Sequence, residues 1–185
     1  MYGILICGPP GTGKSTNIQK MLDQAGFDEE YILADPDKLS GDHTEQSKKA
    51  LELVDESVSS KKSVVYVGAC HGIRTVNLIL KKMKDHKYHT VVAIAYTTVP
   101  TALKRIAART HQPLDADIAS EVHQFFKTKA ERYMTLPNID ELYLYNNETE
   151  FNLLLSKKKK KVVCSDPNGE FYFDISNYCW LKLWY

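Results

Sequence analysis

Short apolar runs alternate with longer amphipathic stretches over the first 150 residues of the chain. The apolar runs are rich in Val, Ile, Leu and Tyr, which is typical of strands buried on both faces of a parallel sheet. They comprise residues 1–7, 31–34, 63–68, 90–96 and 141–145. The stretches between them carry apolar residues at helical spacing and comprise residues 15–24, 43–60, 75–86, 100–110 and 117–134. This alternation predicts an α/β fold with a mainly parallel five-stranded sheet, whose catalytic groups lie at the carboxyl ends of the strands.

The pattern changes after Asn147. Residues 162–164 and 171–174 are short and apolar, and a Pro-Asn-Gly sequence lies between them. This arrangement predicts an antiparallel β-hairpin with its turn at residues 167–169. Because 185 residues suit a single domain, we expect a core over residues 1–150 and a C-terminal hairpin extension over residues 151–185, packed on the same domain.

Composition excludes some classes of protein. Hydrophobic residues make up 43% of the chain and charged residues 25%, as in ordinary soluble globular proteins. The formal net charge of +1 gives no overall attraction to nucleic acid or to a membrane. No apolar run reaches the ~18 residues needed to span a membrane, and the predicted first strand leaves no room for a secretory leader.

The four cysteines, at positions 7, 70, 164 and 179, are neither clustered nor in C-x-x-C spacing. We therefore expect neither a zinc site nor a disulfide framework. Unpaired cysteines indicate a reducing compartment, and we expect the protein to be cytoplasmic.

The first apolar run leads directly into Gly8-Pro-Pro-Gly-Thr-Gly-Lys-Ser15, a complete G-x-x-x-x-G-K-S phosphate-binding loop. The glycines bring backbone N–H groups onto the phosphates, Lys14 reaches the outer phosphates, and the Ser15 hydroxyl is placed for Mg²⁺. A helix after the loop adds its positive N-terminal end. We therefore expect the three-layer sandwich of the P-loop NTPases, with ATP or GTP and Mg²⁺ as cofactors. The predicted nucleotide contacts are Gly8, Pro9, Pro10, Gly11, Thr12, Gly13, Lys14, Ser15 and Thr16.

Two absent motifs narrow the reaction. The guanine-reading N-K-x-D is missing, which argues against the usual GTPases, and no hydrophobic run ends in Asp-Glu, which argues against a motor ATPase. A small kinase remains, and three further features favour it.

The first feature is a pair of carboxylates, Asp35-Pro-Asp37-Lys38, directly after the second predicted strand. A carboxylate here faces the phosphate-binding loop, where it can accept the proton of an acceptor hydroxyl or help to hold Mg²⁺. Asp35 is the predicted base and, with Ser15, the predicted metal ligand. Asp37 is the alternative base, and Asp37 and Lys38 are predicted to bind substrate. A solvated Asp-Pro turn is the alternative interpretation.

The second feature is a pair of arginines, Arg105 and Arg109, which lie four residues apart on a predicted helix and so project from one face. A positioned arginine can accelerate phosphoryl transfer roughly 10³- to 10⁵-fold. The following His111-Gln-Pro113 is a predicted hinge. We expect a helical lid over about residues 105–116, with an exposed basic helix face as the alternative.

The third feature is the turn Gly68-Ala-Cys-His-Gly72-Ile-Arg74-Thr75 after the third predicted strand. Its glycines allow a ligand to approach closely, and Arg74 and Thr75 are candidate substrate-binding residues. A strand-to-helix turn capped near Thr75 is an equally good interpretation. The third strand ends in Gly68, where many kinases carry an acidic residue that binds Mg²⁺ through water.

In this order, the parts resemble the zeta-toxin-like branch of the P-loop kinases. The resemblance rests on the phosphate-binding loop, Asp-x-Asp-Lys, Gly-Ile-Arg-Thr, the Val-Pro start of the lid helix, and Leu142-Tyr-Leu-Tyr-Asn-Asn147. It implies that ATP or GTP phosphorylates a hydroxyl of a sugar nucleotide or similar small metabolite. The chain lacks the family's third-strand acid and has His111 or Gln112 in place of the second lid arginine.

The lid is also similar to that of phage-type polynucleotide 5′-hydroxyl kinases, in which two arginines four apart follow a Val-Pro start. Asp35 and Lys38 match that family's Asp and basic residue, although the family has arginine at the second position. This resemblance implies a 5′-hydroxyl nucleic acid as acceptor.

Lysines and aromatic residues dominate the C-terminal region. Lys157 to Lys161 form a run of lysines that we expect to be a solvated linker between a helix and a strand. Bordering the acceptor site, it would favour a polynucleotide. The aromatic residues after it are suited to covering a core or to stacking bases: Phe171, Tyr172, Phe173, Tyr178, Trp180, Trp184 and Tyr185.

These features combine into one predicted mechanism. Lys14 neutralises the β- and γ-phosphates, Asp35 deprotonates the acceptor hydroxyl, and Arg105 and Arg109 close over the transferred group. The expected partner is a small-molecule hydroxyl acceptor, with single-stranded or 5′-hydroxyl nucleic acid as the alternative and no membrane. A catalytically weak nucleotide-binding switch or scaffold is an alternative of a different class. The sequence indicates no oligomeric state.

Overall fold

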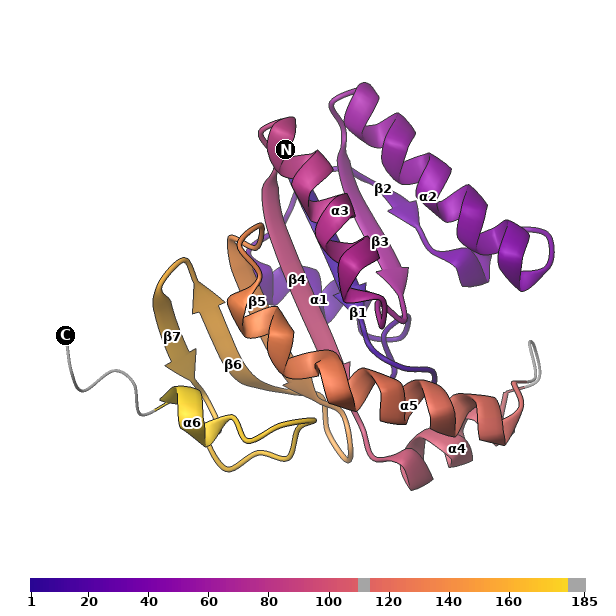
Figure 1. The fold of residues 1–185 in the computed structure, drawn as a ribbon, viewed down its shortest axis with the longest axis vertical. Coiled ribbons are helices and arrows are strands. Elements are labelled where there is room, and N and C mark those ends of the chain that lie inside the picture. The colour runs from indigo at the N-terminus through magenta and orange to yellow at the C-terminus, as the bar shows by residue number, and fades with distance from the viewer. Residues whose placement is uncertain (110–113, 180–185) are drawn as a thin grey trace.

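A computed structural model describes residues 1–109 and 114–179, which form one seven-stranded sheet covered by helices (Figure 1). The strand order is β2-β3-β1-β4-β5-β6-β7. The first five strands are parallel: β1 (Tyr2–Cys7), β2 (Tyr31–Ala34), β3 (Ser63–Gly68), β4 (His89–Tyr96) and β5 (Glu141–Asn146). Two antiparallel strands extend this core: β6 (Asn152–Lys158) and β7 (Lys161–Cys164). The mainly parallel sheet is confirmed, but the predicted number of five strands is wrong because β6 and β7 continue the same sheet.

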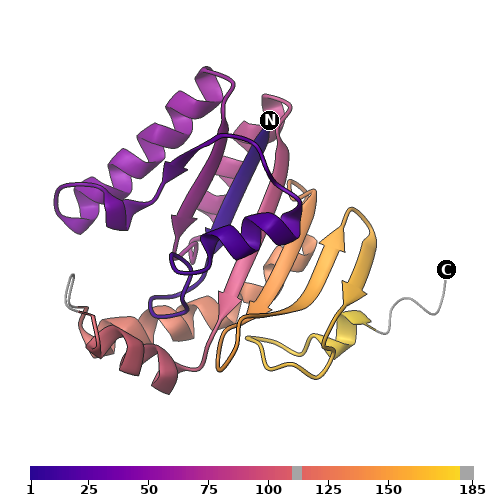
Figure 2. The same ribbon diagram turned by 180° about the vertical axis from the view of Figure 1, so that it is seen from behind.

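Helices lie on both faces of the sheet, which makes three layers (Figures 1 and 2). The α-helices are α1 (Ile18–Ala25), α2 (His43–Ser59), α3 (Ile73–Asp85), α4 (Val99–Ala107), α5 (Ala116–Ala130) and α6 (Ser176–Cys179). Short 3-10 helices follow β2 and α5: η1 (Pro36–Lys38) and η2 (Glu131–Thr135). Leu5 and Cys7 of β1 pack in the core cluster shared with α2, α3 and α5, whereas Ile4 and Ile6 pack with α1. Successive side chains of a strand point to opposite faces of the sheet, so β1 contributes to a separate core on each face.

The C-terminal hairpin consists of β6 and β7, not of the two segments that the sequence predicts. Lys159, with φ of +54°, lies in the turn between these strands. Residues 171–174 form no strand; Phe171 and Tyr172 are instead buried, and Tyr172 contacts the rings of Tyr96 and Phe126. The Pro-Asn-Gly sequence does mark a turn, but a turn signal does not identify the strand partner. Here packing of the aromatic rings on the sheet decides the path of the chain.

The lysine run therefore belongs to the sheet rather than to a linker between a helix and a strand. Lys157 donates to the Met134 carbonyl, and Lys158 forms an ion pair with Glu141 at 2.9 Å. The expected linker between a helix and a strand is therefore wrong, although Lys158 and the three lysines after it are exposed. Trp180, Trp184 and Tyr185 lie outside the described residues.

All four cysteines are paired, which contradicts the expectation of no disulfides. Cys7 joins Cys70 with a Cα–Cα distance of 5.3 Å, and Cys164 joins Cys179 at 5.6 Å. Spacing along the sequence misleads here, because β1 pairs with β3 and places the residues after β3 beside the end of β1. The argument from unpaired cysteines for a reducing compartment is lost with it.

None of the helices within residues 1–109 and 114–179 is both long and apolar enough to cross a membrane.

Candidate active site

The phosphate-binding loop lies between β1 and α1, at the carboxyl edge of the parallel strands. Gly8, Gly11 and Gly13 have φ angles of +147°, +78° and +79°, which side chains rarely adopt. A Cβ on Gly11 would lie 2.6 Å from the Ala102 carbonyl oxygen, and one on Gly13 would collide with the Asn147 amide. The loop is thus pressed between α4 and the β5–β6 loop, and only glycine fits there.

The helix after the loop begins at Ile18, three residues later than predicted. Lys14 to Asn17 form turns in which the Asn17 N–H donates to the Lys14 carbonyl at 3.0 Å. The Asn17 side chain donates to the Gly13 carbonyl at 2.9 Å. Local hydrogen bonds of this kind compete with the helix, and they leave Ser15 and Thr16 exposed on the loop.

Lys14 is folded back over its own loop. Its Nζ donates to the carbonyl oxygens of Gly8 at 2.6 Å and Pro9 at 2.9 Å. Burial lowers the pKa of Lys14 to about 8; the Asp37 charge opposes this effect, the Arg109 charge adds to it, and the Asp35 charge opposes it. The charges of the acids after β2 and of the second arginine therefore all act on the lysine.

Asp35 is the most unusual side chain of the site. It directly follows β2, is only 2% exposed, and accepts a hydrogen bond through Oδ1 from the Asp37 N–H at 3.1 Å. Its Oδ2 is buried and has no hydrogen-bond partner among the described residues. Burial raises the pKa of Asp35, and the Asp37 charge contributes in the same direction. A buried carboxyl with one unsatisfied oxygen and a raised pKa has the properties of a proton acceptor.

The other predicted substrate contacts are exposed. Asp37 and Lys38 lie on η1, and Arg74 and Thr75 lie in the first turn of α3, which begins before the cap predicted near Thr75. Within the described parts of the chain, no hydrogen bond or ion pair joins Arg74 or Thr75 to the phosphate-binding loop. The Asp37 charge acts on Lys14. The roles of Asp37, Lys38, Arg74 and Thr75 in substrate binding stay predictions.

The end of β3 carries no acid, as the sequence indicates. Gly68 pairs with Cys7, and a Cβ at this position would lie 2.9 Å from the Tyr66 hydroxyl. Burial raises the pKa of Tyr66, and the Asp35 charge raises it further. The Tyr66 ring therefore occupies the space beside Gly68 at the end of β3, and its hydroxyl senses the Asp35 charge.

The two predicted lid arginines differ in position. Arg105 is on α4, and its guanidinium donates to the carbonyl oxygens of Asn147 at 2.7 Å, Glu148 at 3.2 Å and Gly11 at 3.4 Å. Arg109 is exposed and lies beyond the end of α4 at Ala107, so the two residues do not share one helix face. The predicted hinge and the positions of His111 and Gln112 lie outside the described residues.

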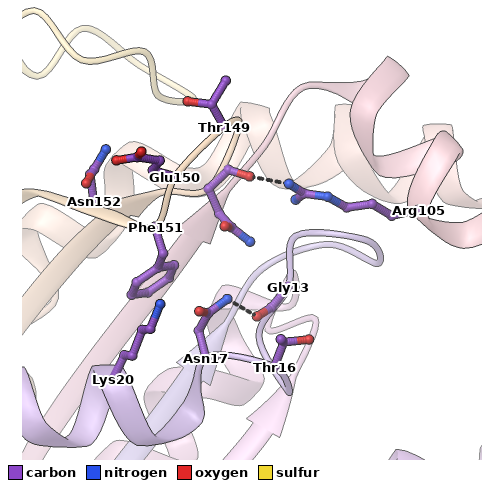
Figure 3. Close-up of a pocket in the computed structure, with 10 residues that line it drawn as sticks. Gly13, Thr16, Asn17, Lys20, Arg105, Thr149, Glu150, Phe151 and Asn152 are labelled. Atoms are coloured by element: carbon purple, nitrogen blue, oxygen red, sulfur yellow. Dashed lines mark hydrogen bonds between the residues drawn. The ribbon is translucent and has the colours of Figure 1, made fainter.

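A cavity of about 520 Å³ lies next to the phosphate-binding loop. Figure 3 shows Lys20, Asn17 and Thr16 on one side, Arg105 on a second, and Phe151 with its neighbours on a third. The lining residues are Gly13, Thr16, Asn17, Lys20, Arg105, Asn147, Thr149, Glu150, Phe151 and Asn152. Its volume is in the range of ligand pockets.

Sequence reasoning did not identify most of this lining as functional. The available signal was the polar run from Asn146 to Glu150, which directly follows a buried strand at the carboxyl edge of the sheet.

The donor set for Mg²⁺ is small. No group of three His, Cys, Asp or Glu side chains within residues 1–109 and 114–179 is arranged to hold a metal ion. The exposed Ser15 hydroxyl and the unsatisfied Oδ2 of Asp35 are oxygen donors. They fit a cation that keeps several waters and is held mainly by nucleotide phosphates.

Sequence comparison identifies one family. The sequence model of the "ATPase family associated with various cellular activities (AAA)" matches residues 4–114, which run from β1 past α4 and include the phosphate-binding loop. No curated protein matches the sequence.

Solved structures share the fold at low sequence identity. The complex AvrRxo1-ORF1:AvrRxo1-ORF2 with sulphate ions contains a chain with a TM-score of 0.68 and 11% identity, covering 89% of this chain and 61% of that one. This chain thus spans less than two thirds of that protein's length. A chain of the PezAT toxin–antitoxin system of Streptococcus pneumoniae has a TM-score of 0.62 and 14% identity, and the match covers 89% of this chain and 75% of that one. A gluconokinase from Sinorhizobium meliloti 1021 has a TM-score of 0.52 and 13% identity, and the match covers 78% of this chain and 82% of that one.

Proposed function

This chain belongs to the ATPase family associated with various cellular activities (AAA), and on that premise we propose that it is a kinase. It transfers the γ-phosphate of ATP to a hydroxyl of a small nucleotide-linked or sugar-nucleotide metabolite. The family supplies the nucleotide-binding fold and leaves the acceptor open. The observation that carries the proposal is Asp35, a buried carboxyl with an unsatisfied oxygen beside the lysine of a phosphate-binding loop.

Fold similarity adds support of a general kind. A gluconokinase and the PezAT toxin–antitoxin system share this fold, and a further similar structure is a putative kinase from Chloroflexus aurantiacus with a TM-score of 0.53. A structure of AvrRxo1-ORF1:-ORF2 with ATP has a TM-score of 0.66. The fold thus accommodates ATP in one of these proteins, and another of them is a gluconokinase.

The residues of this chain divide the work. Backbone N–H groups of the phosphate-binding loop hold the phosphates, and Lys14 turns from the Gly8 and Pro9 carbonyls toward them. Asp35 accepts the proton of the acceptor hydroxyl through Oδ2, which has no competing partner within the described chain. Arg109, whose charge acts on Lys14, stabilises charge on the transferred group. Ser15 would hold Mg²⁺ together with the nucleotide phosphates, and when bound the ion neutralises charge on the β- and γ-oxygens. Asp35 keeps Oδ2 for the acceptor proton, so it is not proposed as a metal ligand.

The cavity is suited to the nucleoside end of the donor. It adjoins Gly13 and Thr16 of the loop, and the Phe151 ring in its wall stacks against Tyr145 at a centroid distance of 4.7 Å. An aromatic ring held in this way offers a flat surface to a purine base. GTP is the alternative donor.

A specific observation favours one second candidate, a catalytically weak nucleotide-binding switch. Lys14 is occupied by carbonyls of its own loop, and β3 ends without an acid. Such a protein would bind nucleotide and transfer nothing.

Incubation with γ-labelled ATP and a panel of acceptors separates these functions. The panel contains sugar nucleotides, nucleosides and 5′-hydroxyl oligonucleotides, with Lys14→Met as the inactive control. Label on sugar nucleotides or nucleosides supports the proposal, and label on the oligonucleotide alone identifies a polynucleotide kinase. Tight ATP binding without label on any acceptor would overturn the kinase in favour of the switch.

A further inference from the structure

The side chain of Glu148 joins the β5–β6 loop to the start of α4. Its Oε2 accepts hydrogen bonds from the Thr97 hydroxyl at 2.6 Å and the Thr98 N–H at 2.8 Å. Its Oε1 accepts from the Thr98 hydroxyl at 2.8 Å and from the Thr101 hydroxyl. All of these donors belong to the junction between β4 and α4 or to the first turn of α4. One carboxylate thus accepts from three hydroxyls and one N–H at the start of α4, while the Thr98 hydroxyl accepts from the Thr101 N–H at 3.5 Å.

Glu148 remains charged at neutral pH. Burial acts to raise its pKa, but the hydrogen bonds from Thr101, Thr97 and Thr98 outweigh burial and lower the pKa to about 2. The bonds that Glu148 accepts are therefore charge-assisted, which makes them stronger than bonds between neutral groups.

The backbone of Glu148 is connected to the phosphate-binding loop through hydrogen bonds of Arg105. The Glu148 and Asn147 carbonyls both accept from Arg105, which also donates to Gly11 of the loop. The Asn147 side chain donates to the Thr12 carbonyl at 2.9 Å. The phosphate-binding loop is thus held at two carbonyls, through Arg105 and through Asn147.

These contacts also join two walls of the cavity. Arg105 comes from α4, whereas Asn147 and residues 149–151 come from the β5–β6 loop and Asn152 begins β6. We propose that Glu148 is a positioning residue, which holds Arg105 of α4 against the phosphate-binding loop and so sets the affinity for ATP. This inference rests on the nucleotide binding of the proposed function, and it does not depend on the identity of the acceptor.

Glu148→Gln tests the inference. Glutamine keeps the length of the side chain, but it has one acceptor oxygen in place of the two carboxylate oxygens that now accept from the threonines. We expect the Kd for Mg²⁺-ATP, measured by titration calorimetry well below the melting temperature, to rise about tenfold. The KM for ATP should rise with it, while kcat at saturating ATP changes less than about threefold. Glu30→Gln is the matched control, since Glu30 is exposed and precedes β2 at the opposite edge of the sheet.

A double-mutant cycle separates positioning from general stability. If Glu148 acts through Arg105, Glu148→Gln should weaken ATP binding less than about twofold in an Arg105→Ala background. A purely structural role would lower the melting temperature in both backgrounds and leave the Kd of the folded protein unchanged. Thr101→Val removes one donor and keeps the carboxylate, so it decides the matter if Glu148→Gln does not fold: a Kd raised about threefold supports the inference.

An unchanged Kd in a folded Glu148→Gln or Thr101→Val variant, or additive effects in the cycle, would overturn the inference and leave the kinase proposal intact. ATP binding without transfer by the wild-type chain would overturn the kinase alone. Failure of the wild-type chain to bind any nucleotide would overturn both.

Discussion

The two sides of the phosphate-binding loop differ in how their polar groups are satisfied. On the donor side, Arg105, Asn147 and Glu148 hydrogen-bond to one another's segments and to the loop. On the acceptor side, Oδ2 of Asp35 has no partner among the described residues, and Lys38 and Arg74 are exposed.

This difference has a physical consequence. The hydrogen bonds of the donor side are made within the protein itself, so they do not depend on a nucleotide to order these side chains. An unsatisfied buried oxygen is costly, and such groups are retained where a ligand or a reaction uses them. If the proposed function holds, the donor side is thus preorganised, whereas the acceptor side keeps an unsatisfied oxygen that an acceptor hydroxyl would bind.

Asp35→Asn should show the largest effect and tests the acceptor side directly. We expect transfer to fall about 10²- to 10⁴-fold, because the amide cannot take the acceptor proton. ATP affinity measured by calorimetry should stay within about twofold. Full activity in the Asn variant would show that another group, with Asp37 the first candidate, is the base.

The same substitution has a distinctive effect on stability. Because burial raises the pKa of Asp35, the wild-type protein loses stability as the pH rises from about 4, the ordinary value for Asp, through the raised value. Asp35→Asn should therefore be at least as stable as the wild type at pH 7, and the two should converge below pH 4. Urea unfolding across this range measures it, and a less stable variant at pH 7 would contradict the assignment.

Replacing Arg105 or Arg109 by lysine keeps the positive charge, so the two variants compare what each guanidinium contributes. Arg109→Lys should lower kcat about 10²-fold without changing the melting temperature, since the exposed side chain lies beyond α4 and lysine is a poor substitute for a forked guanidinium. Arg105→Lys should raise the Kd for ATP about tenfold and lower the melting temperature, because one ammonium cannot span the three carbonyls. The comparison fails if the two variants show the same pattern.

The lowered pKa of Lys14 predicts how ATP affinity depends on pH. With a pKa of about 8, the free protein loses the lysine charge between pH 7 and pH 9, so affinity should fall about tenfold over this interval. At pH 8, binding should take up about half a proton, which calorimetry in buffers of different ionisation enthalpy detects. Lys14→Met should bind more weakly and lose this pH dependence; a wild-type affinity that is flat to pH 9 would contradict the shift.

The second disulfide provides the smallest expected effect on the site. Removing it with Cys164→Ser and Cys179→Ser should cost about 3 kcal/mol of stability, given the sequence separation of 15. The Kd for ATP should not change, because this disulfide joins β7 to α6, away from the loop. Altered ATP binding in the double variant would show that the hairpin region supports the donor side.

The sequence by itself determined the elements that local patterns encode. The five parallel strands were predicted within one residue at each end. A strand covered by helices on both faces needs a continuous apolar run, and such a run is easily recognised in the sequence. The phosphate-binding loop was also predictable, since glycine, lysine and serine at fixed spacing are needed for backbone geometry and phosphate charge. The start of α1 was missed, because hydrogen bonds of Asn17 compete locally with helix formation.

Only the tertiary structure decided what depends on residues far apart in the chain. The pairing of β1 with β3 brings Cys7 to Cys70, and packing of Tyr172 on Tyr96 and Phe126 removes the predicted second hairpin strand. The role of Glu148 depends on threonines about 50 residues earlier in the chain, at separations of 47 to 51. No local pattern records such contacts, because their free energy is gained only when the folded sheet brings both segments to the same edge.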